Sequence, residues 1–319
     1  MVAETGKGSG GGKSSLKFLR RGKVKEIYEV SDEVLEFRFT DDISVFDKKI
    51  PSPIPHKGET LARTSAHWFR MCSRLGIRHH FLELMDGNRM QVRRVDVSAD
   101  MAHHAKKSVL IPLEFIVRYY VAGTLWDRIQ KGKTHPGELG LPAHHTITYG
   151  EKLPTPHFEM TTKLEHIDRL LSEKEAMEIG GITRKQVNEI QEVILSVDRG
   201  IEKDIHPRGL IHVDGKKEFA FDAEGQVMIV DTFGTGDEDR FWDTKEMERG
   251  RFEDFSKEFV RQYYRKSGYH EQLMKAREHG GEEPPIPGLP PQMVEEVSKM
   301  YRSIYERLTG EPFRPVRSA

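Results

Sequence analysis

The stretch that decides the fold is residues 209–243, GLIHVDGKKEFAFDAEGQVMIVDTFGTGDEDRFWD. Leu210 to Asp214 is an apolar run typical of a buried strand, and residues 214–221 continue it. Residues 222–225 (DAEG) are typical of a turn, and residues 226–231 return as a second apolar run. We therefore predict an antiparallel hairpin with Phe221 opposite Gln226.

One face of this hairpin is expected to be strongly charged. The same register places Lys216 opposite Asp231, and side chains alternate between faces with a period of two. Four side chains then share one face: Asp214, Lys216, Glu218 and Asp231. The other face is expected to be apolar: Val213, Phe219, Phe221, Met228 and Val230. Crowded carboxylates favour a hard divalent cation such as Mg²⁺, and a solvent-facing charged stripe is the alternative.

Three other segments present cations that could hold an anion. The glycine-bearing loop after the hairpin ends in Arg240, for which an ordinary surface Arg–Asp pair is the alternative. Arg118 interrupts an otherwise apolar strand and needs a partner, either a protein carboxylate or a substrate phosphate. Lys23 and Lys25 share one face of an N-terminal strand, where they could contact a polyphosphate.

The rest of the chain mixes short strands with separate helices. A second hairpin is expected at residues 24–30 and 34–39. Three helices are expected: one after Gly58, one after a capping box at Thr183 and Gln186, and one from Pro291 to Gly310. The first should bury a stripe of residues, Leu61, Ser65, Trp68, Cys72 and Leu75.

Because strands and helices do not alternate regularly, we predict an α+β fold. We place a boundary near Pro112. The expected parts are a flexible tail at residues 1–15, a β-rich N-terminal lobe at 16–112 and a larger α+β lobe at 113–319.

Composition excludes several classes of protein. The 319 residues carry 50 basic and 51 acidic side chains, a net charge of -1, which argues against a nucleic-acid partner. The single cysteine, Cys72, fits a reducing compartment. No apolar run reaches the roughly 18 residues of a membrane span, and no secretory signal is evident, so we expect a cytoplasmic protein. The adjacent histidine pairs (79/80, 103/104, 144/145) are interpreted as surface residues, because neighbouring side chains point apart.

Seven segments, in order, resemble the motifs of one enzyme family. They are RGKVKEIYEV (21–30), DDISVFD (41–47), IPHKGETLARTSAHWF (54–69), PLEFIVRYYVAGTL (112–125), TTKLEHID (161–168), VDGKKEF (213–219) and DTFGTGDEDRFWD (231–243). Together they resemble the phosphoribosylaminoimidazole-succinocarboxamide synthase (SAICAR synthetase) family over roughly residues 17–310.

The resemblance implies a two-lobed fold with ATP in the cleft and a first lobe similar to those of protein kinases and ATP-grasp enzymes. It implies a ligase that condenses carboxyaminoimidazole ribonucleotide (CAIR) with L-aspartate through an acyl phosphate. Its small-molecule partners would be ATP, CAIR and aspartate, with Mg²⁺ as cofactor and a homo-oligomer possible. A kinase-like phosphotransferase and a non-catalytic nucleotide-binding module are the alternatives, although the chain has no His-Arg-Asp or Asp-Phe-Gly motif.

The resemblance also implies roles for individual residues. Lys23 and Lys25 would contact the ATP phosphates, and Glu218 and Asp231 would bind Mg²⁺. The ribonucleotide phosphate would be held by Arg118, Gly123, Thr124 and Arg240. Lys163 and Asp168 would orient the substrates, and the polarity of the catalytic site would be completed by Asp214, Lys216 and Asp237.

The sequence departs from the family pattern at four places. Thr124 stands where serine is usual and keeps the hydroxyl. Thr232 stands where glutamate commonly follows the metal aspartate, which removes one candidate ligand. Asp239 stands where serine precedes the arginine, which leaves a phosphate contact there open. Residues Val97 to Leu110 resemble an insertion, which leaves the adenine contacts open.

Overall fold

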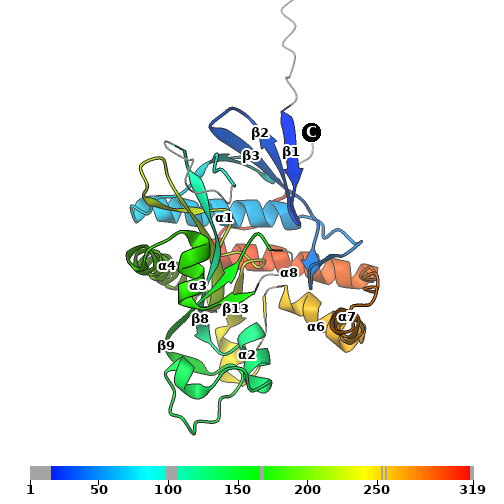
Figure 1. Ribbon diagram of the computed structural model, residues 1–319. Helices are drawn as coiled ribbons and strands as arrows, with labels where there is room; N and C mark the ends of the chain where they lie inside the picture. Colours follow the sequence, from blue (N-terminus) through cyan, green and yellow to red (C-terminus); the bar gives the residue numbers. More distant parts are fainter. Residues whose placement is uncertain (1–15, 98–106, 166–168, 253, 256, 317–319) are drawn as a thin grey trace, which may run out of the picture.

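The computed structural model describes residues 16–97, 107–165, 169–252, 254–255 and 257–316. Two main antiparallel sheets are combined with separate helices (Figure 1), which confirms the predicted α+β class. Among the described helices, none is both long and apolar enough to cross a membrane.

The smaller sheet is built from the N-terminal part of the chain, in the order β1-β2-β3-β7-β6. Its strands are β1 (Lys17–Arg21), β2 (Lys25–Glu29), β3 (Val34–Phe39), β6 (Phe81–Asp86) and β7 (Arg89–Arg93). A separate two-stranded sheet contains β4 (Ser44–Val45) and β5 (Lys48–Lys49). The antiparallel pairing of β2 with β3 confirms the predicted N-terminal hairpin.

The first helix, α1 (Lys57–Arg74), lies between the smaller sheet and α8 (Pro291–Thr309) (Figure 1). Four residues of its predicted stripe are buried: Leu61, Ser65, Trp68 and Cys72. Leu75 is instead the C-cap and is 48% exposed, so the stripe ends one turn earlier than predicted. Trp68 Nε1 donates a hydrogen bond to the carbonyl oxygen of Gly234 at 2.8 Å, which ties α1 to the loop that follows β12.

The larger sheet has the order β10-β9-β8-β11-β12, and β13 also pairs with β11. Its strands are β8 (Val109–Tyr120), β9 (Lys152–Thr162), β10 (Leu170–Leu171), β11 (Leu210–Phe221), β12 (Val227–Val230) and β13 (Asp239–Asp243). Residues 112 and 113, where the sequence places the lobe boundary, lie inside β8. The division into lobes remains a prediction.

The remaining helices are α2 (Gly123–Gln130), α3 (Glu173–Gly180), α4 (Arg184–Ile205), α5 (Thr244–Glu248), α6 (Glu258–Lys266) and α7 (Tyr269–Glu278), with 3₁₀ turns η2 (Pro136–Leu139) and η3 (His206–Arg208). Of these, α3, α4 and α5 pack on the larger sheet, while α6 and α7 pack against each other to one side (Figure 1). The Thr183–Gln186 capping box begins α4, and Gly310 ends α8 in a left-handed conformation, both as predicted.

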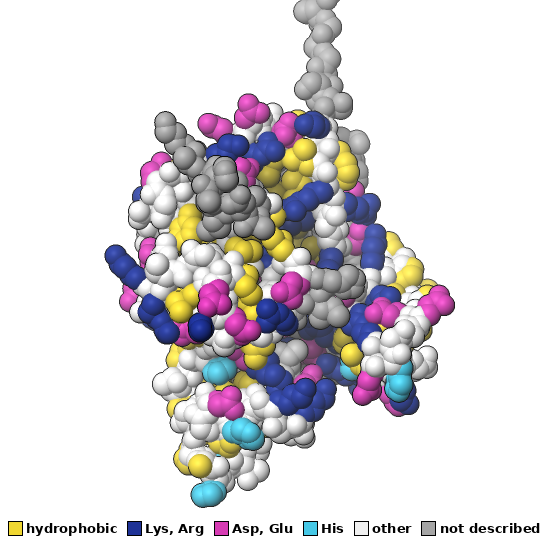
Figure 2. All heavy atoms as spheres, in the orientation of Figure 1, with side chains coloured by type: hydrophobic (Ala, Val, Ile, Leu, Met, Phe, Trp, Pro, Cys, Tyr) yellow, Lys and Arg dark blue, Asp and Glu magenta, His cyan; other side chains and the backbone are white. Residues whose placement is uncertain are grey.

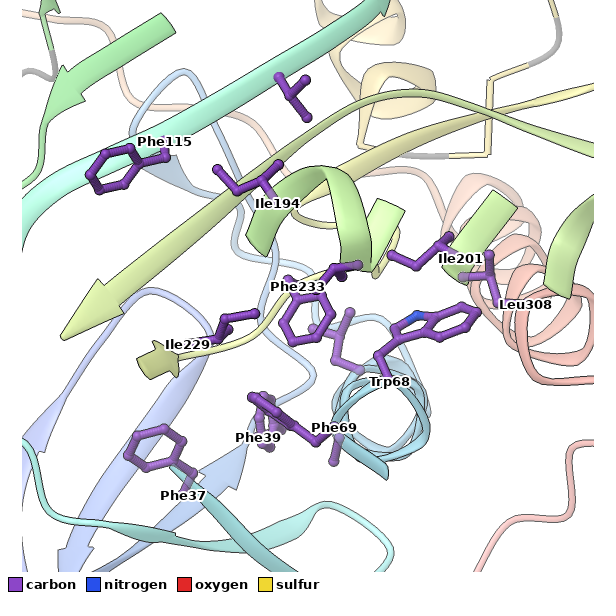
Figure 3. Close-up of a cluster of buried hydrophobic side chains, with 14 of the residues drawn as sticks. Phe37, Phe39, Trp68, Phe69, Phe115, Ile194, Ile201, Ile229, Phe233 and Leu308 are labelled. Carbon is purple, nitrogen blue, oxygen red and sulfur yellow. The ribbon is translucent and has the colours of Figure 1, made fainter. Parts of the chain in front are cut away.

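One hydrophobic core joins the two sheets (Figure 3). Phe37 of the smaller sheet, Phe69 of α1 and Ile201 of α4 belong to the same cluster as Phe233. Phe233 is fully buried although it lies in the loop between β12 and β13. Burying a phenylalanine side chain contributes about 1.5–3 kcal/mol, so this loop is anchored from inside the protein.

The hairpin of β11 and β12 forms, but its register differs by one residue from the prediction. Phe221 lies opposite Val227, and Glu218 lies opposite Val230. The turn is longer because the Asp222 side chain accepts hydrogen bonds from the backbone N–H groups of Glu224 and Gln226. As a result, Met228 and Val230 pack with Ala220 and Leu110 and not, as predicted, on the face of Phe219.

Asp231 is therefore not opposite Lys216, and that part of the prediction is wrong. Asp231 follows the last residue of β12 and has a left-handed backbone with φ 62°. This bend at the end of the strand sets the direction of the Asp231 side chain, which strand alternation alone cannot give.

Candidate active site

A cavity of about 610 Å³ lies against one face of the larger sheet. Its lining comes from β8, β9 and β11, from residues 44–47, from the loop before β13 and from α6. The register places Asp214 opposite Arg118 and Glu218 opposite Glu114, so these side chains share a face. Figure 2 shows Lys and Arg side chains interspersed with Asp and Glu over one face of the molecule, as expected for a net charge of -1.

Glu218 and Asp231, the predicted metal ligands, are brought into one charged cluster. The Lys163 ammonium group pairs with Glu218, and the Lys25 ammonium group pairs with Asp231. Burial, together with the Asp231 charge, raises the pKa of Glu218 to about 7. Burial opposes ionisation of Asp231 too, but Lys25 and Lys163 outweigh it and lower the pKa of that carboxyl. Two carboxylates are thus held close enough to influence each other's ionisation.

Lys216 lies beside this pair on the same strand face. Its Nζ is 2.6 Å from Glu114 Oε1, 3.6 Å from Glu238 Oε2 and 3.9 Å from Glu218 Oε1. Burial alone would lower the pKa of Lys216, but the charges of Glu238 and Glu114 raise it well above its ordinary value. Lys216 therefore stays a cation, which suits it to neutralise developing negative charge but not to act as a base.

A second group of residues centres on two arginines. Arg118 donates hydrogen bonds to Glu159 at 2.7 Å, to Asp214 at 3.0 Å and to the Thr124 hydroxyl at 3.0 Å. Arg240 donates to the same Asp214 oxygen at 2.6 Å. Asp214 thus bridges the two guanidinium groups, and Arg118 has protein carboxylates as partners in this structure.

Gly123 makes room for Arg240 at the start of α2. It has φ 53°, and a Cβ added there would lie 2.6 Å from Arg240 Nη2. Ala122, the N-cap of α2, provides no side-chain cap. The first N–H groups of a helix carry partial positive charge and lack intrahelical acceptors. The arginines therefore lie beside a helix end suited to an anion.

The Asp237 carboxylate is buried in the wall of the cavity. Its carboxylate is 2.8 Å from Lys57 Nζ and 2.9 Å from Lys257 Nζ, and it accepts a hydrogen bond from the Tyr301 hydroxyl at 2.6 Å. Burial would raise the pKa of Asp237, but the two ammonium groups lower it. Asp237 therefore stays an anion and joins α1, α8 and the site loop.

Lys23 is an exposed residue among the predicted site residues that the structure describes. It pairs with Asp47 at 2.6 Å, and its side chain is 62% exposed at the cavity edge. Asp168 lies outside the described residues. The predicted residues that the structure describes thus fall into the acidic cluster with its lysines, the arginine pair beside α2, Lys23 at the cavity edge and Asp237 in the cavity wall.

Several cavity residues were missed in the sequence: Glu114, Arg128, Glu159, Lys257, Arg261 and Arg265. Glu114 could have been found, because it lies four residues before Arg118 on one predicted strand and therefore on the same face. Glu159 pairs with Arg118 and Arg128, but only the pairing of β8 with β9 brings it there. No sequence pattern around Arg261 and Arg265 of α6 indicates that they line a cavity.

The departures from the family pattern have structural explanations at two positions. The Thr232 hydroxyl is 3.3 Å from an Asp231 oxygen and 3.3 Å from a Glu238 oxygen, so it supports the acidic cluster from outside. The Asp239 carboxylate contacts His212 Nε2 at 2.7 Å and is 3% exposed as a residue, so it is held by protein groups. Most of the apparent insertion from Val97 to Leu110 lies outside the described residues.

One histidine interpretation is wrong. His80 is 2% exposed, with its ring against Phe37 and Phe69 and its Nε2 3.1 Å from the Asp231 carbonyl oxygen. Burial lowers the pKa of His80 to about 3. A neutral imidazole therefore supports the backbone of Asp231. Residues 103 and 104 lie outside the described residues.

Comparison with known proteins supports a common family. A sequence profile described as SAICAR synthetase matches residues 18–276. Two proteins named phosphoribosylaminoimidazole-succinocarboxamide synthase are similar over 93% of this chain and 99% of their own length. That of Thermoplasma acidophilum is 51% identical and that of Thermoplasma volcanium 52%.

Solved structures have the same fold. The SAICAR synthase from Saccharomyces cerevisiae complexed with SAICAR has a TM-score of 0.69 and 25% identity, covering 93% of this chain and 96% of that one. A type-2 SAICAR synthetase in complex with ADP has a TM-score of 0.66 and 26% identity, covering 92% and 99%.

Proposed function

Because the chain belongs to the SAICAR synthetase family, we propose that it is an ATP-dependent ligase of purine biosynthesis that joins CAIR to L-aspartate. The products are SAICAR, ADP and phosphate. The observation that supports this most strongly is a cavity lined by Lys216 and by two arginines at a helix N-terminus, with the lysine-paired Glu218 and Asp231 beside Lys216. These are the groups that a triphosphate and a sugar phosphate require.

The reaction has two chemical steps. The γ-phosphoryl group moves from ATP to a carboxylate oxygen of CAIR, and ADP leaves. The aspartate amine then attacks the acyl carbon, a C–N bond forms, the C–O bond to phosphate breaks, and the amine loses a proton. Lys25, Lys163 and Lys216 neutralise the negative charge that both steps gather in the cavity. Lys23, at the cavity edge, contacts the outer phosphates.

Glu218 and Asp231 fit a magnesium ion. Their oxygens are the donor type that Mg²⁺ prefers. The raised pKa of Glu218 beside Asp231 is the sign of two carboxylates that a divalent cation would stabilise. When bound, Mg²⁺ supplies further neutralisation of the phosphate charge. We propose these two residues as the ligands, with Thr232 orienting Asp231.

We assign the ribonucleotide phosphate to the arginine pair. Arg118, Thr124 and Arg240 lie at the N-terminus of α2, where Gly123 leaves room for the Arg240 guanidinium group. Asp214 keeps both guanidinium groups in place. Arg261 and Arg265 of α6 are proposed to bind the carboxylates of the substrate L-aspartate. Lys163 and Asp168 are proposed to orient the reacting groups.

A coupled assay of ADP formation tests the function and its alternatives. ADP should form only when CAIR and aspartate are both present. ADP release with CAIR but without aspartate would indicate a phosphotransferase, and no ADP at all would indicate a binding module.

Asp231→Asn tests the metal assignment in the same assay. The variant should fold but turn over about 100-fold or more slowly, because an amide oxygen is a poorer Mg²⁺ ligand. Thr235→Ala, in the same loop but absent from the proposed metal set, is the control. A near-normal rate for Asp231→Asn at limiting Mg²⁺ would contradict the assignment.

A further inference from the structure

The far side of the larger sheet contains a second charged cluster, which the chemistry above does not use. It consists of Asp198 of α4, His212 and Lys217 of β11, and Asp239 of β13, and each residue is at most 3% exposed. His212 Nε2 is 2.7 Å from an Asp239 oxygen, and Lys217 Nζ is 2.6 Å from an Asp198 oxygen. Tyr119 donates a hydrogen bond to Asp198 at 2.8 Å. We call this set the buried charge cluster.

The cluster and the active site are formed by the same backbone segments. Lys217 lies between Lys216 and Glu218, and Asp239 lies between Glu238 and Arg240. Because side chains alternate along a strand, Lys216 and Arg240 line the cavity while the side chains of Lys217 and Asp239 enter the cluster from the other face. A shift of the cluster therefore moves the cavity residues.

Asp239 is the connection between the two. Its second oxygen accepts a hydrogen bond from the Gly234 N–H at 2.9 Å, so it anchors the loop between β12 and β13 as well as β13. Gly215, directly opposite Asp239, leaves the space for this carboxylate, since a Cβ at residue 215 would overlap it. Burying such a carboxylate is costly unless its partners are fixed.

A metal site is the other interpretation of these residues. Asp198, His212 and Asp239 have ligand atoms within 4.8 Å of one another. However, Lys217 Nζ lies 2.6 Å from Asp198 and 3.7 Å from Asp239 and is itself fully buried. An ammonium group thus already supplies the cation that the two carboxylates need, and its burial leaves it no route into water.

We propose that the buried charge cluster holds Lys216, Glu238 and Arg240 in their catalytic positions, so that Asp198, His212, Lys217 and Asp239 are positioning residues for the ligase reaction. The proposal rests on the proposed function of the cavity. It predicts that changes in the cluster weaken CAIR binding more than ATP binding. Arg240 is assigned to the CAIR phosphate, whereas Lys23 and Lys25 on the smaller sheet side are assigned to ATP and do not contact the cluster.

Asp239→Asn tests the proposal, because it removes one charge with almost no change of shape. We expect kcat to fall about 10- to 100-fold and KM for CAIR to rise, while KM for ATP changes by less than about threefold. Gly215→Ala should act in the same direction while keeping all four cluster side chains, because its Cβ displaces Asp239. This second variant keeps the test open should Asp239→Asn fail to fold.

The matched control is Ile190→Ala. Ile190 lies on α4 about two turns before Asp198, is fully buried in the core and contributes to stability away from the cluster. Free energies of unfolding, measured in urea, allow variants of equal stability loss to be compared. If Asp239→Asn and Gly215→Ala lose no more kcat than Ile190→Ala, or if KM for ATP rises as much as KM for CAIR, the cluster has only a structural role. A wild-type protein without aspartate-dependent ADP formation would instead refute the proposed function.

Discussion

The contact between Gly123 and Arg240 gives the most direct prediction about the phosphate site. We expect Gly123→Ala to destabilise the protein and to weaken CAIR binding. The new Cβ would lie 2.6 Å from Nη2 and 2.8 Å from Nη1 of Arg240, too close for a carbon atom that can form no hydrogen bond. Arg240 cannot withdraw freely, because it is 7% exposed and bonded to Asp214 at 2.6 Å and Asp254 at 2.8 Å.

The magnitude can be separated into two contributions. A left-handed backbone costs an alanine about 1–2 kcal/mol relative to glycine. Gly132, at the other end of α2, has φ 65°, and no heavy atom lies within 4 Å of the Cβ that an alanine would add there, so Gly132→Ala measures this contribution alone. Breaking a buried ion pair costs about 3–5 kcal/mol. Gly123→Ala should therefore cost about 3 kcal/mol more than Gly132→Ala.

Two measurements on the pair of variants decide the matter. Urea unfolding gives the two losses of stability, and initial rates give KM for CAIR. We expect KM for CAIR to rise about tenfold or more in Gly123→Ala and to stay near wild type in Gly132→Ala. Equal stability losses, within about 0.5 kcal/mol, would show that Arg240 yields without cost and would refute the reasoning.

Two further predictions concern Arg118 and His80. Arg118→Lys should raise KM for CAIR about tenfold, because lysine cannot form the forked contacts of a guanidinium, and an unchanged KM would contradict the phosphate assignment. The pKa of His80 is about 3 in the folded protein and about 6.5 in the unfolded chain, so below pH 6.5 only the unfolded chain takes up this proton and stability falls as pH falls. Between pH 6.5 and pH 5 the loss is about 1–2 kcal/mol, and His80→Gln should remove it while His144→Gln, at an exposed position, should not. Identical pH dependence of urea unfolding in wild type and His80→Gln would show that His80 is not the group responsible.

Elements with local signals were predicted well from the sequence. The capping box at Thr183, the stop at Gly310 and the hairpin of β2 and β3 depend on residues within a few positions of one another. The same holds for the charged face of β11, because alternation along one strand needs no partner.

Predictions that depended on a neighbouring strand were less secure. The register of β11 with β12 shifted by one residue because Asp222 and Gly225 form a longer turn. Asp231 nevertheless reached the acidic cluster, because its left-handed backbone bends the chain after β12. The prediction for His80 was wrong because its ring is buried by Phe37, Phe69 and the carbonyl group of Asp231. All three lie more than ten residues away in the sequence, so no local pattern indicates the burial.

The pattern of ion pairs in and beside the cavity bears on how ligands bind. Lys25 is paired with Asp231 and Lys163 with Glu218, while Arg118 is paired with Asp214 and Glu159. A free triphosphate that took Lys25 and Lys163 would leave the carboxylates of Asp231 and Glu218 without cations, and a free Mg²⁺ at those carboxylates would leave two ammonium groups without anions. When both bind together, each charged group exchanges one partner for another. The arrangement therefore favours the magnesium complex of ATP over either component alone, so ATP affinity should depend on Mg²⁺ far more steeply in the wild type than in Asp231→Asn.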